Sequence, residues 1–118
     1  MGIKIWVDDL RPAPNGYRFH CKSVNEAIQL IQNIEDGLAF KRFATDDYIS
    51  PHDEYMIELI DLDHDAGDYA ADGGDFIKVL DWLEATGRNY PIRIHTMNPV
   101  GRYNMHAIIQ KNGWTEVY

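Results

Sequence analysis

The sequence predicts a single α/β domain over residues 1–118, built on a mainly parallel sheet of about five strands with helices on both faces. Short β-branched and aromatic runs alternate with stretches of helical periodicity, which is the pattern of chains that form parallel sheets. Apolar residues make up 45% of the composition, which is enough for a packed core. The length of 118 residues fits one domain of ordinary size.

Five segments have the composition of strands. They are residues 3–7, 17–21, 55–62, 90–94 and 114–118. The first is a β-branched and aromatic run that stops at Asp8. The third alternates imperfectly between apolar and polar residues, as expected of a central strand that is covered on both faces. Residues 11–16 hold two prolines and an Asn-Gly pair, so we expect a loop there and not a helix.

The first predicted helix begins at Ser23, which has the capping-box spacing to Glu26. Apolar residues follow at helical spacing, and the pair Asp36-Gly37 predicts its end. Residues 38–54 allow two interpretations. Their apolar positions fit either a short strand or a packed loop, and the polar stretch from residue 45 to 53 reads as a loop.

Two further helices follow the central strand. A glycine-containing loop over residues 66–74 leads into a helix predicted for residues 75–85. The last helix is predicted for residues 101–111, with Gly113 at its end.

Charge and cysteine content exclude several classes of protein. The net charge of -8 argues against a binder of duplex nucleic acid, which depends on clustered Lys and Arg. The single cysteine, Cys21, cannot form an internal disulfide, so nothing indicates secretion. The polar Asp8 comes too early for a signal peptide, and no apolar run is long enough to cross a membrane. A cytoplasmic location without a membrane partner is the default expectation.

Polar residues follow three of the predicted strands. They are Asp8-Asp9, Asp63-His64-Asp65 and the run from His95 to Asn98. In open α/β sheets the ligand lies beyond the carboxyl ends of the strands, so these side chains should share one edge. An Asp after a strand can also serve only as a turn former or helix cap. The convergence of three segments nevertheless favours a binding site.

Carboxylates that gather at one edge repel each other unless they hold a cation or share a proton. Oxygen ligands favour Mg²⁺, with Mn²⁺ as a close relative, and such a metal can clamp phosphate oxygens and activate a water. We therefore expect Asp8, Asp9 and Asp63 to be metal ligands and a small phosphorylated molecule to be the ligand.

The two histidines of the same edge add acid–base chemistry. His64 and His95 can accept and return a proton near neutral pH, and Asp65 can orient one of them. Opening a phosphate ester also needs donors or positive charge for the phosphoryl oxygens. The candidates for that role are Thr96, Asn98, Arg102, Asn104 and Arg11, of which Arg102 can equally be a simple surface residue.

These motifs resemble bacterial response-regulator receiver domains, which have a flavodoxin-like fold. The acidic pair Asp8-Asp9, Asp63 after the central strand and Thr96 after the next strand match receiver positions. The details are more similar to a divergent branch, the cyclic-phosphate processing receiver-like domains. The matching stretches are residues 6–16, 61–67 and 94–99, followed by Arg102, Asn104 and Met105. The resemblance implies action on cyclic phosphates of nucleotides or RNA ends.

The chain departs from ordinary receivers in ways that count against a phosphorylation switch. The loop over residues 11–16 stands where receivers have their first helix, and no Lys follows the last predicted strand. The chain ends at Tyr118, before a last receiver helix.

Three hypotheses follow from the sequence. The first is a metal-assisted phosphoesterase, a hydrolase for cyclic phosphates. The alternative is a receiver-like signalling or phospho-ligand-binding module without turnover, in which Asp63 is the phosphoacceptor or the pocket only binds. The third is a small interaction protein with a vestigial acidic edge, whose tryptophans lie on a partner surface or fill the core.

Overall fold

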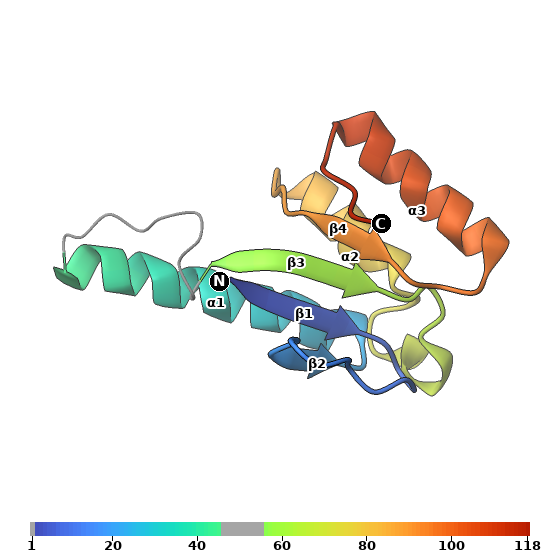
Figure 1. The fold of residues 1–118 in the computed structure, drawn as a ribbon, viewed down its shortest axis with the longest axis horizontal. Helices are drawn as coiled ribbons and strands as arrows, with labels where there is room; N and C mark the ends of the chain where they lie inside the picture. Colours follow the sequence, from blue (N-terminus) through green and yellow to red (C-terminus); the bar gives the residue numbers. More distant parts are fainter. Residues whose placement is uncertain (1, 46–55) are drawn as a thin grey trace.

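The computed structural model describes the backbone of residues 2–45 and 56–118, and the side chains of residues 2–37 and 56–118. Two strands come first, and from α1 onward helices and strands alternate, with one short 3₁₀ helix, η1, before α2 (Figure 1). In chain order the elements are β1 (Ile3–Val7), β2 (Phe19–Cys21), α1 (Val24–Thr45), β3 (Ile57–Leu62), η1 (Gly67–Ala71), α2 (Ile77–Ala85), β4 (Ile92–Ile94) and α3 (Pro99–Asn112). No described helix is both long and apolar enough to cross a bilayer.

The described strands form one four-stranded parallel sheet in the order β2-β1-β3-β4. Ile5 of β1 lies opposite Phe19 on one side and Ile60 on the other, and Ile60 in turn lies opposite Ile92. From β1 the sheet continues to β2 on one side and to β3 and β4 on the other. The carboxyl ends of β1 and β3 are therefore the topological switch point, where ligands bind in such sheets. The predicted α/β fold class with a parallel sheet is confirmed.

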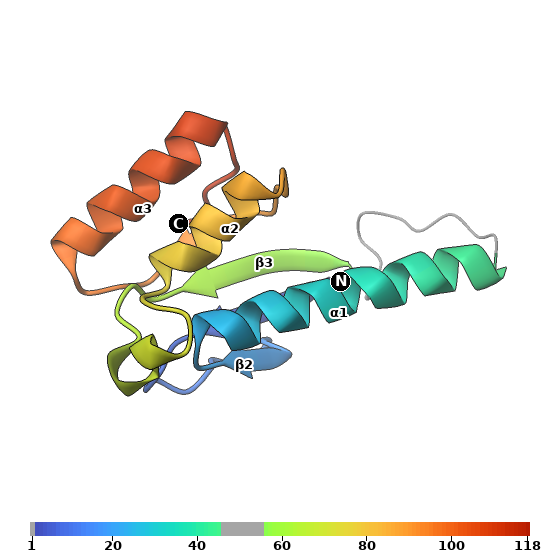
Figure 2. The ribbon, with the colours of Figure 1, turned by 180° about the vertical axis from the view of Figure 1, so that it is seen from behind.

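The layers are more one-sided than the sequence predicts. α1 and α2 lie behind the sheet in Figure 1 and in front of it in Figure 2. One buried cluster joins residues of all three helices to alternate strand residues such as Ile5, Ile60 and Ile92. Their neighbours in the strands point the other way, because side chains alternate across a sheet. Within the described part of the chain that second face, which we call the open face, carries no helix.

The segment after α3 forms less of a strand than predicted. Residues 114–118 contribute a single parallel bridge, between Glu116 and Ile92. Two hydrogen bonds support it, from Ile92 N to Thr115 O at 3.0 Å and from Val117 N to Ile92 O at 2.7 Å. The predicted fifth strand is therefore reduced to a bridge, because β4 is only three residues long and offers a short edge for pairing.

The first helix is longer than predicted. It runs to Thr45, so the predicted end at Asp36-Gly37 is wrong, as is the prediction of a strand or packed loop from residue 38 to 45. A glycine ends a helix when it adopts the left-handed conformation, and Gly37 does not. Gly37 in a helix interior costs only about 1 kcal/mol relative to Ala. The remaining residues of that prediction, 46–54, lie outside the described part.

The other helix ends follow local signals in the sequence. Ser23 caps α1, because its Oγ accepts a hydrogen bond from Glu26 N at 3.1 Å. α3 begins two residues earlier than predicted, because Asn98 caps it and Pro99 occupies the first helical position, where a missing N–H costs nothing. Gly113 ends α3 in the left-handed conformation, as expected.

Candidate functional site

Asp8 lies at the carboxyl end of β1, and its two carboxylate oxygens have different hydrogen-bond partners. The side chain is 1% exposed. Oδ1 accepts hydrogen bonds from Leu10 N at 2.9 Å and Arg11 N at 2.8 Å, which turns the loop after the strand. Oδ2 faces the ring of His95 at 2.9 Å. Burial opposes ionisation, but the two amides and His95 together hold the pKa of Asp8 below its usual value. Asp8 is therefore a fixed, ionised group.

Asp63 occupies the equivalent position after β3. Its backbone N–H donates to Val7 O at 2.9 Å, which extends the pairing of β1 and β3 into the site. Its Oδ1 accepts from His64 N at 2.7 Å, and its Oδ2 lies 3.6 Å from Arg11 Nη2. The Nε of the same guanidinium is 3.3 Å from Asp8 Oδ2. Arg11 therefore lies between the two carboxylates.

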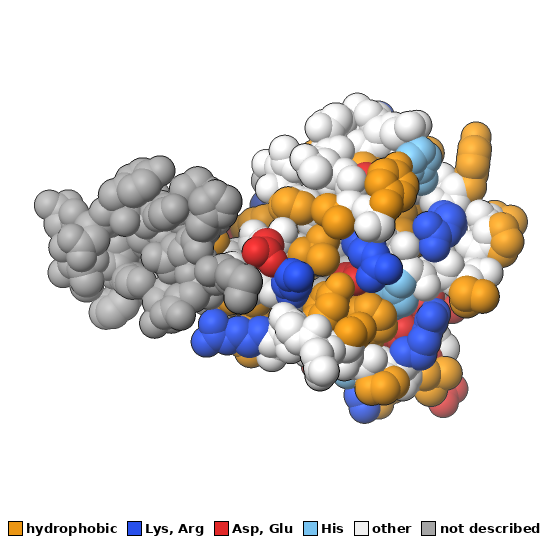
Figure 3. Space-filling view, viewed as in Figure 1, with side chains coloured by type: hydrophobic (Ala, Val, Ile, Leu, Met, Phe, Trp, Pro, Cys, Tyr) orange, Lys and Arg blue, Asp and Glu red, His pale blue; other side chains and the backbone are white. Residues whose placement is uncertain are grey.

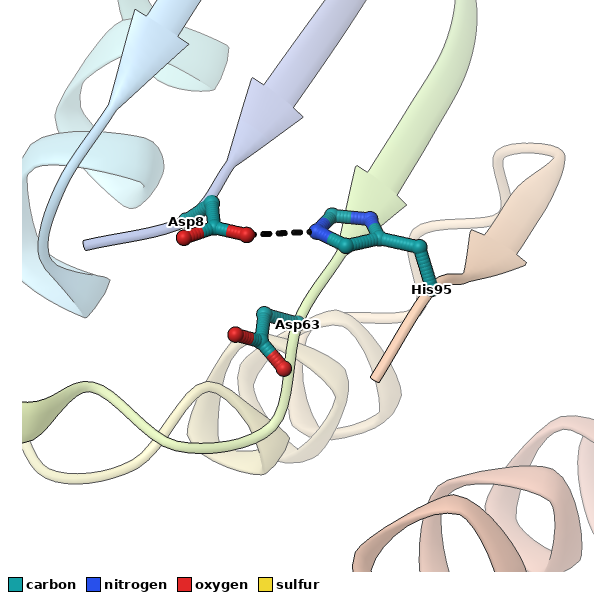
Figure 4. Close-up of side chains that lie close together, drawn as sticks. All are labelled: Asp8, Asp63 and His95. Carbon is teal, nitrogen blue, oxygen red and sulfur yellow. Dashed lines mark hydrogen bonds and ion pairs between the residues drawn. The ribbon is translucent and has the colours of Figure 1, made fainter. Parts of the chain in front are cut away.

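Asp8, Asp63 and His95 bring their side chains together at this edge (Figure 4). One ligand atom from each lies within 4.8 Å of the other two. The three residues come from the ends of β1, β3 and β4, which is the convergence that the sequence predicts. The grouping differs from the predicted ligand set in one member, because His95 takes part and Asp9 does not.

Asp9 lies just outside this group. A Cβ built on Gly67 would come within 2.4 Å of Asp9 Oδ2, so the carboxylate packs directly against the start of η1. Burial raises the pKa of Asp9, and the negative charges of Asp8 and Asp63 raise it further. Part of this rise comes from the negative charge at this edge, and a cation would relieve that part.

His95 is held from three sides. Its side chain is 7% exposed. Nδ1 lies 2.6 Å from Asp61 Oδ1, and Nε2 lies 2.9 Å from Asp8 Oδ2. The ring stacks on Trp6, with the centroids 3.8 Å apart and the planes 3° from parallel. Since carboxylates only accept hydrogen bonds, both bonds form together only when both ring nitrogens carry a proton.

Asp61 is the other anchor of His95, and the sequence interpretation missed it. It is fully buried in β3, where it also accepts hydrogen bonds from Tyr17 Oη and, at 3.0 Å, from Arg93 Nη1. Burial opposes ionisation of Asp61, but the bonds from His95 and Tyr17 lower its pKa. Burial and Asp61 together raise the pKa of Tyr17 to about 12.

A signal for Asp61 was present in the sequence. Asp61 lies between Ile60 and Leu62 in a strand predicted to be covered on both faces, and a charged residue that is buried must be paired, so it marks a polar network. Tyr17, Trp6 and Arg93 offered no comparable signal, because each is an ordinary residue for a strand or loop.

The side chain of His64 is more exposed than that of His95. Its side chain is 15% exposed, and Nδ1 lies 2.8 Å from Asp65 Oδ1. The hydrogen bond from His64 lowers the pKa of Asp65. The ring packs against Gly101 of α3, where a Cβ would lie 2.4 Å from His64 Cγ. His64, Asp65 and Asp75 form a second group with ligand atoms within 4.8 Å of one another.

The predicted phosphate-binding residues that follow β4 have different surroundings. Asn98 joins the His64 side of the site, because its Nδ2 donates to Asp65 Oδ1 at 3.3 Å while its Oδ1 caps α3. Thr96 is buried and its hydroxyl accepts from Asn98 N at 3.1 Å, which shapes the loop. Arg102 donates to Thr96 O at 3.2 Å. Asn104 is exposed on α3.

The fold and this edge define an α/β domain of receiver type, in which the end of every strand that flanks the switch point supplies a carboxylate or an imidazole. Residues 3–111 match the family model described as the cyclic-phosphate processing receiver domain. The chain therefore belongs to this family, as its motifs predicted. No curated protein and no solved structure matches the chain.

Proposed function

We propose that this protein is a metal-assisted phosphoesterase that opens cyclic phosphates of nucleotides or RNA ends. In this reaction the oxygen of a water forms a bond to phosphorus, and one bond from phosphorus to a ribose oxygen breaks. The product is a monoester. The observation that carries the proposal is the group of Asp8, Asp63 and His95 beside the more exposed His64–Asp65 pair.

The donor set fits a divalent cation with oxygen ligands. Asp8, Asp63 and the adjacent Asp9 would hold it, since Asp8 and Asp63 offer ligand atoms within 4.8 Å of each other and Asp9 follows Asp8 in the chain. A bound Mg²⁺ or Mn²⁺ would polarise a phosphoryl oxygen and lower the pKa of a water. Arg11 lies between Asp8 and Asp63 and supplies positive charge on the same side.

His64 is the proton carrier in this proposal. Asp65 accepts from Nδ1, so the neutral ring keeps its proton there and leaves Nε2 able to accept one. Nε2 takes the proton of the attacking water, and the same proton then passes to the leaving ribose oxygen. His95 has both nitrogens on carboxylates, so we assign it to holding Asp8 and Asp61 in place and not to proton transfer.

The phosphoryl group would lie between Arg11 and the start of α3. Arg11 is a side-chain cation at the carboxylate group, and the first turn of α3 adds the positive end of a helix dipole. Arg102 lies one turn into this helix, anchored on Thr96 O. Both guanidinium groups would contact the non-bridging oxygens, which gain charge as the ring opens.

Phosphorus NMR with uridine 2′,3′-cyclic phosphate tests the proposal. We expect a monoester signal with Mg²⁺ or Mn²⁺, loss of turnover with EDTA, and loss of turnover in Asp63→Asn. The matched control is Asp81→Asn, because Asp81 pairs with Lys78 on the exposed side of α2. Absence of a monoester with either metal, on mononucleotide and oligonucleotide alike, would reject the phosphoesterase. Acetyl phosphate with intact-mass analysis would then test Asp63 as the phosphoacceptor of a signalling module.

A further inference from the structure

A cavity lies between α3 and the segment that follows this helix. Its volume is about 380 Å³, within the range of about 300 to 1,000 Å³ that is usual for small-molecule sites. Figure 1 shows the end of the chain running back beside α3. We call this feature the α3 cavity, and the residues that line it are Pro99, Arg102, Tyr103, His106, Glu116 and Tyr118.

The α3 cavity begins at the edge of the proposed active site. Gly101 packs against the ring of His64, and the next residue, Arg102, lines the cavity and donates to Thr96 O at 3.2 Å. His106 lies four residues after Arg102, about 6 Å along a helix axis that rises about 1.5 Å per residue. One ribose separates the phosphate of a nucleotide from its base. A nucleotide whose phosphate contacts Arg102 would therefore place its base beside His106.

Two tyrosines give the cavity flat aromatic surfaces. Tyr103 is 73% exposed and Tyr118 is 87% exposed, so both rings are available to a ligand. Figure 3 shows hydrophobic side chains close to histidine and Lys or Arg side chains over α3 and the end of the chain. A nucleobase stacks on such rings whatever its identity, because every base has a flat π face. These tyrosines favour a base in the cavity without selecting one.

The polar part of the cavity can select a base. The side chain of Glu116 is 10% exposed, and its Oε1 lies 2.5 Å from His106 Nδ1. Among the described residues the other oxygen, Oε2, has no hydrogen-bond partner, and no fully buried side-chain oxygen of these residues lacks one. Oε2 is therefore accessible. Because a carboxylate only accepts hydrogen bonds, Glu116 offers an acceptor to the edge of a bound base.

We infer that the α3 cavity binds the base of the cyclic nucleotide and selects guanine. This inference rests on the proposed function and adds to it a preference that the phosphate chemistry does not require. Guanine presents two neighbouring donors, N1–H and the N2 amino group, and a carboxylate can accept from both. Uracil, cytosine and adenine each offer a single donor group at that edge, next to acceptors that the carboxylate repels. Glu116 is thus the specificity-determining residue.

The test measures base preference in binding and in turnover. Isothermal titration calorimetry compares guanosine 3′-monophosphate with uridine 3′-monophosphate, and steady-state kinetics compares the two 2′,3′-cyclic nucleotides. The variants are Glu116→Gln and Tyr103→Ala/Tyr118→Ala. The matched controls are Glu84→Gln, whose carboxylate pairs with Lys111, and Tyr69→Ala, which removes an exposed tyrosine of η1. Melting temperatures check that each variant folds.

The wild-type protein should bind the guanosine nucleotide about tenfold more tightly, the usual size of discrimination by two hydrogen bonds to a base edge. In Glu116→Gln the amide carbonyl stays with His106 and the amino group faces the donors of guanine, so the preference should fall to about twofold or less. The affinity for the uridine nucleotide should stay within about twofold.

The double tyrosine variant should weaken binding of both nucleotides about tenfold and keep their ratio, because stacking is tolerant of base identity. The two controls should change neither the affinities nor the ratio. The ratio of kcat/KM for the two cyclic nucleotides should follow the ratio of affinities in every variant.

Three results would overturn the inference. One is equal affinity of the wild-type protein for the guanosine and uridine nucleotides. Another is an unchanged guanine preference in Glu116→Gln. A third is the same loss of preference in Glu84→Gln. Guanine-selective binding that depends on Glu116, without turnover of either cyclic nucleotide, would support the base site and reject the phosphoesterase. Equal turnover of both cyclic nucleotides would do the reverse, so the two proposals fail separately.

Discussion

His64 and His95 follow neighbouring strands of one sheet, and the structure gives them opposite surroundings. His95 is stacked on Trp6 and has a carboxylate at each ring nitrogen. His64 has one carboxylate partner, Asp65, and a more exposed ring. Carboxylates contact both ring nitrogens of His95, whereas the ion pair described for His64 involves Nδ1. The number of carboxylate partners is the basis on which we propose a holding role for His95 and a proton-carrying role for His64.

The largest effect that we expect is a loss of turnover in His64→Ala, and it tests the role proposed for His64. General acid–base groups contribute about 10²- to 10⁴-fold, so kcat for the cyclic nucleotide should fall in that range. The free energy of unfolding should change by less than about 1 kcal/mol, since the ring is partly exposed and its loss leaves Asp65 in contact with solvent. Steady-state kinetics and urea unfolding measure the two effects. Full activity of His64→Ala would give the proton-carrying role to another group.

His95→Ala should act mainly on stability. The substitution leaves Asp8 and Asp61 without the imidazole that lies between them, although Arg11 and Arg93 remain close. Removing one partner of a buried ion pair lowers the free energy of unfolding by about 3 kcal/mol. Urea unfolding measures this loss. His106→Ala is the matched control, because it breaks a partly exposed pair with Glu116 and should cost about 1 kcal/mol or less. Equal losses in both variants would contradict the holding role.

A smaller effect is expected from Asp61→Asn, which weakens the same anchor. Hydrogen bonds to charged groups contribute about 1 to 3 kcal/mol, so the variant should lose an amount in that range at pH 6. The folded pKa values of Asp61 and Asp8 lie below the usual 3.8. Their contribution is therefore full above pH 3.8 and is lost as the pH falls below it.

Urea unfolding between pH 6 and pH 2 measures this dependence. The wild-type stability should fall more steeply than that of Asp61→Asn in the acidic part of the range. Parallel curves for the two proteins would show that folding does not lower the pKa of Asp61.

The smallest effect concerns the position of the His64 ring. Gly101→Ala favours the helix by about 1 kcal/mol in propensity, yet the new Cβ would lie 2.4 Å from His64 Cγ and displace the ring. We expect kcat to fall about tenfold, because an error of about 1 Å in a reacting group is costly. The double variant with His64→Ala should be no less active than His64→Ala alone. Additive losses would show that Gly101 acts through another group.

Local signals in the sequence predicted much of the fold. The run of residues 3–7, the cap at Ser23 and the stop at Gly113 each depend on chemistry within a few residues, and each is confirmed. The end of α1 was mispredicted because a glycine stops a helix only if its backbone turns left-handed, and Gly37 does not. The last strand shortened to a bridge because pairing depends on the length of its neighbour β4.

The sequence by itself determined which residues reach the carboxyl edge, since parallel strands end together and the residues after them are read directly from the chain. Asp8, Asp63 and His95 meet there for that reason. Only the tertiary structure decided what each group faces. The register that sets Asp61 opposite Trp6 and Arg93 gives His95 its second carboxylate, and the approach of Gly101 positions His64. Such contacts join segments that are far apart in the chain, so only the packed fold specifies them.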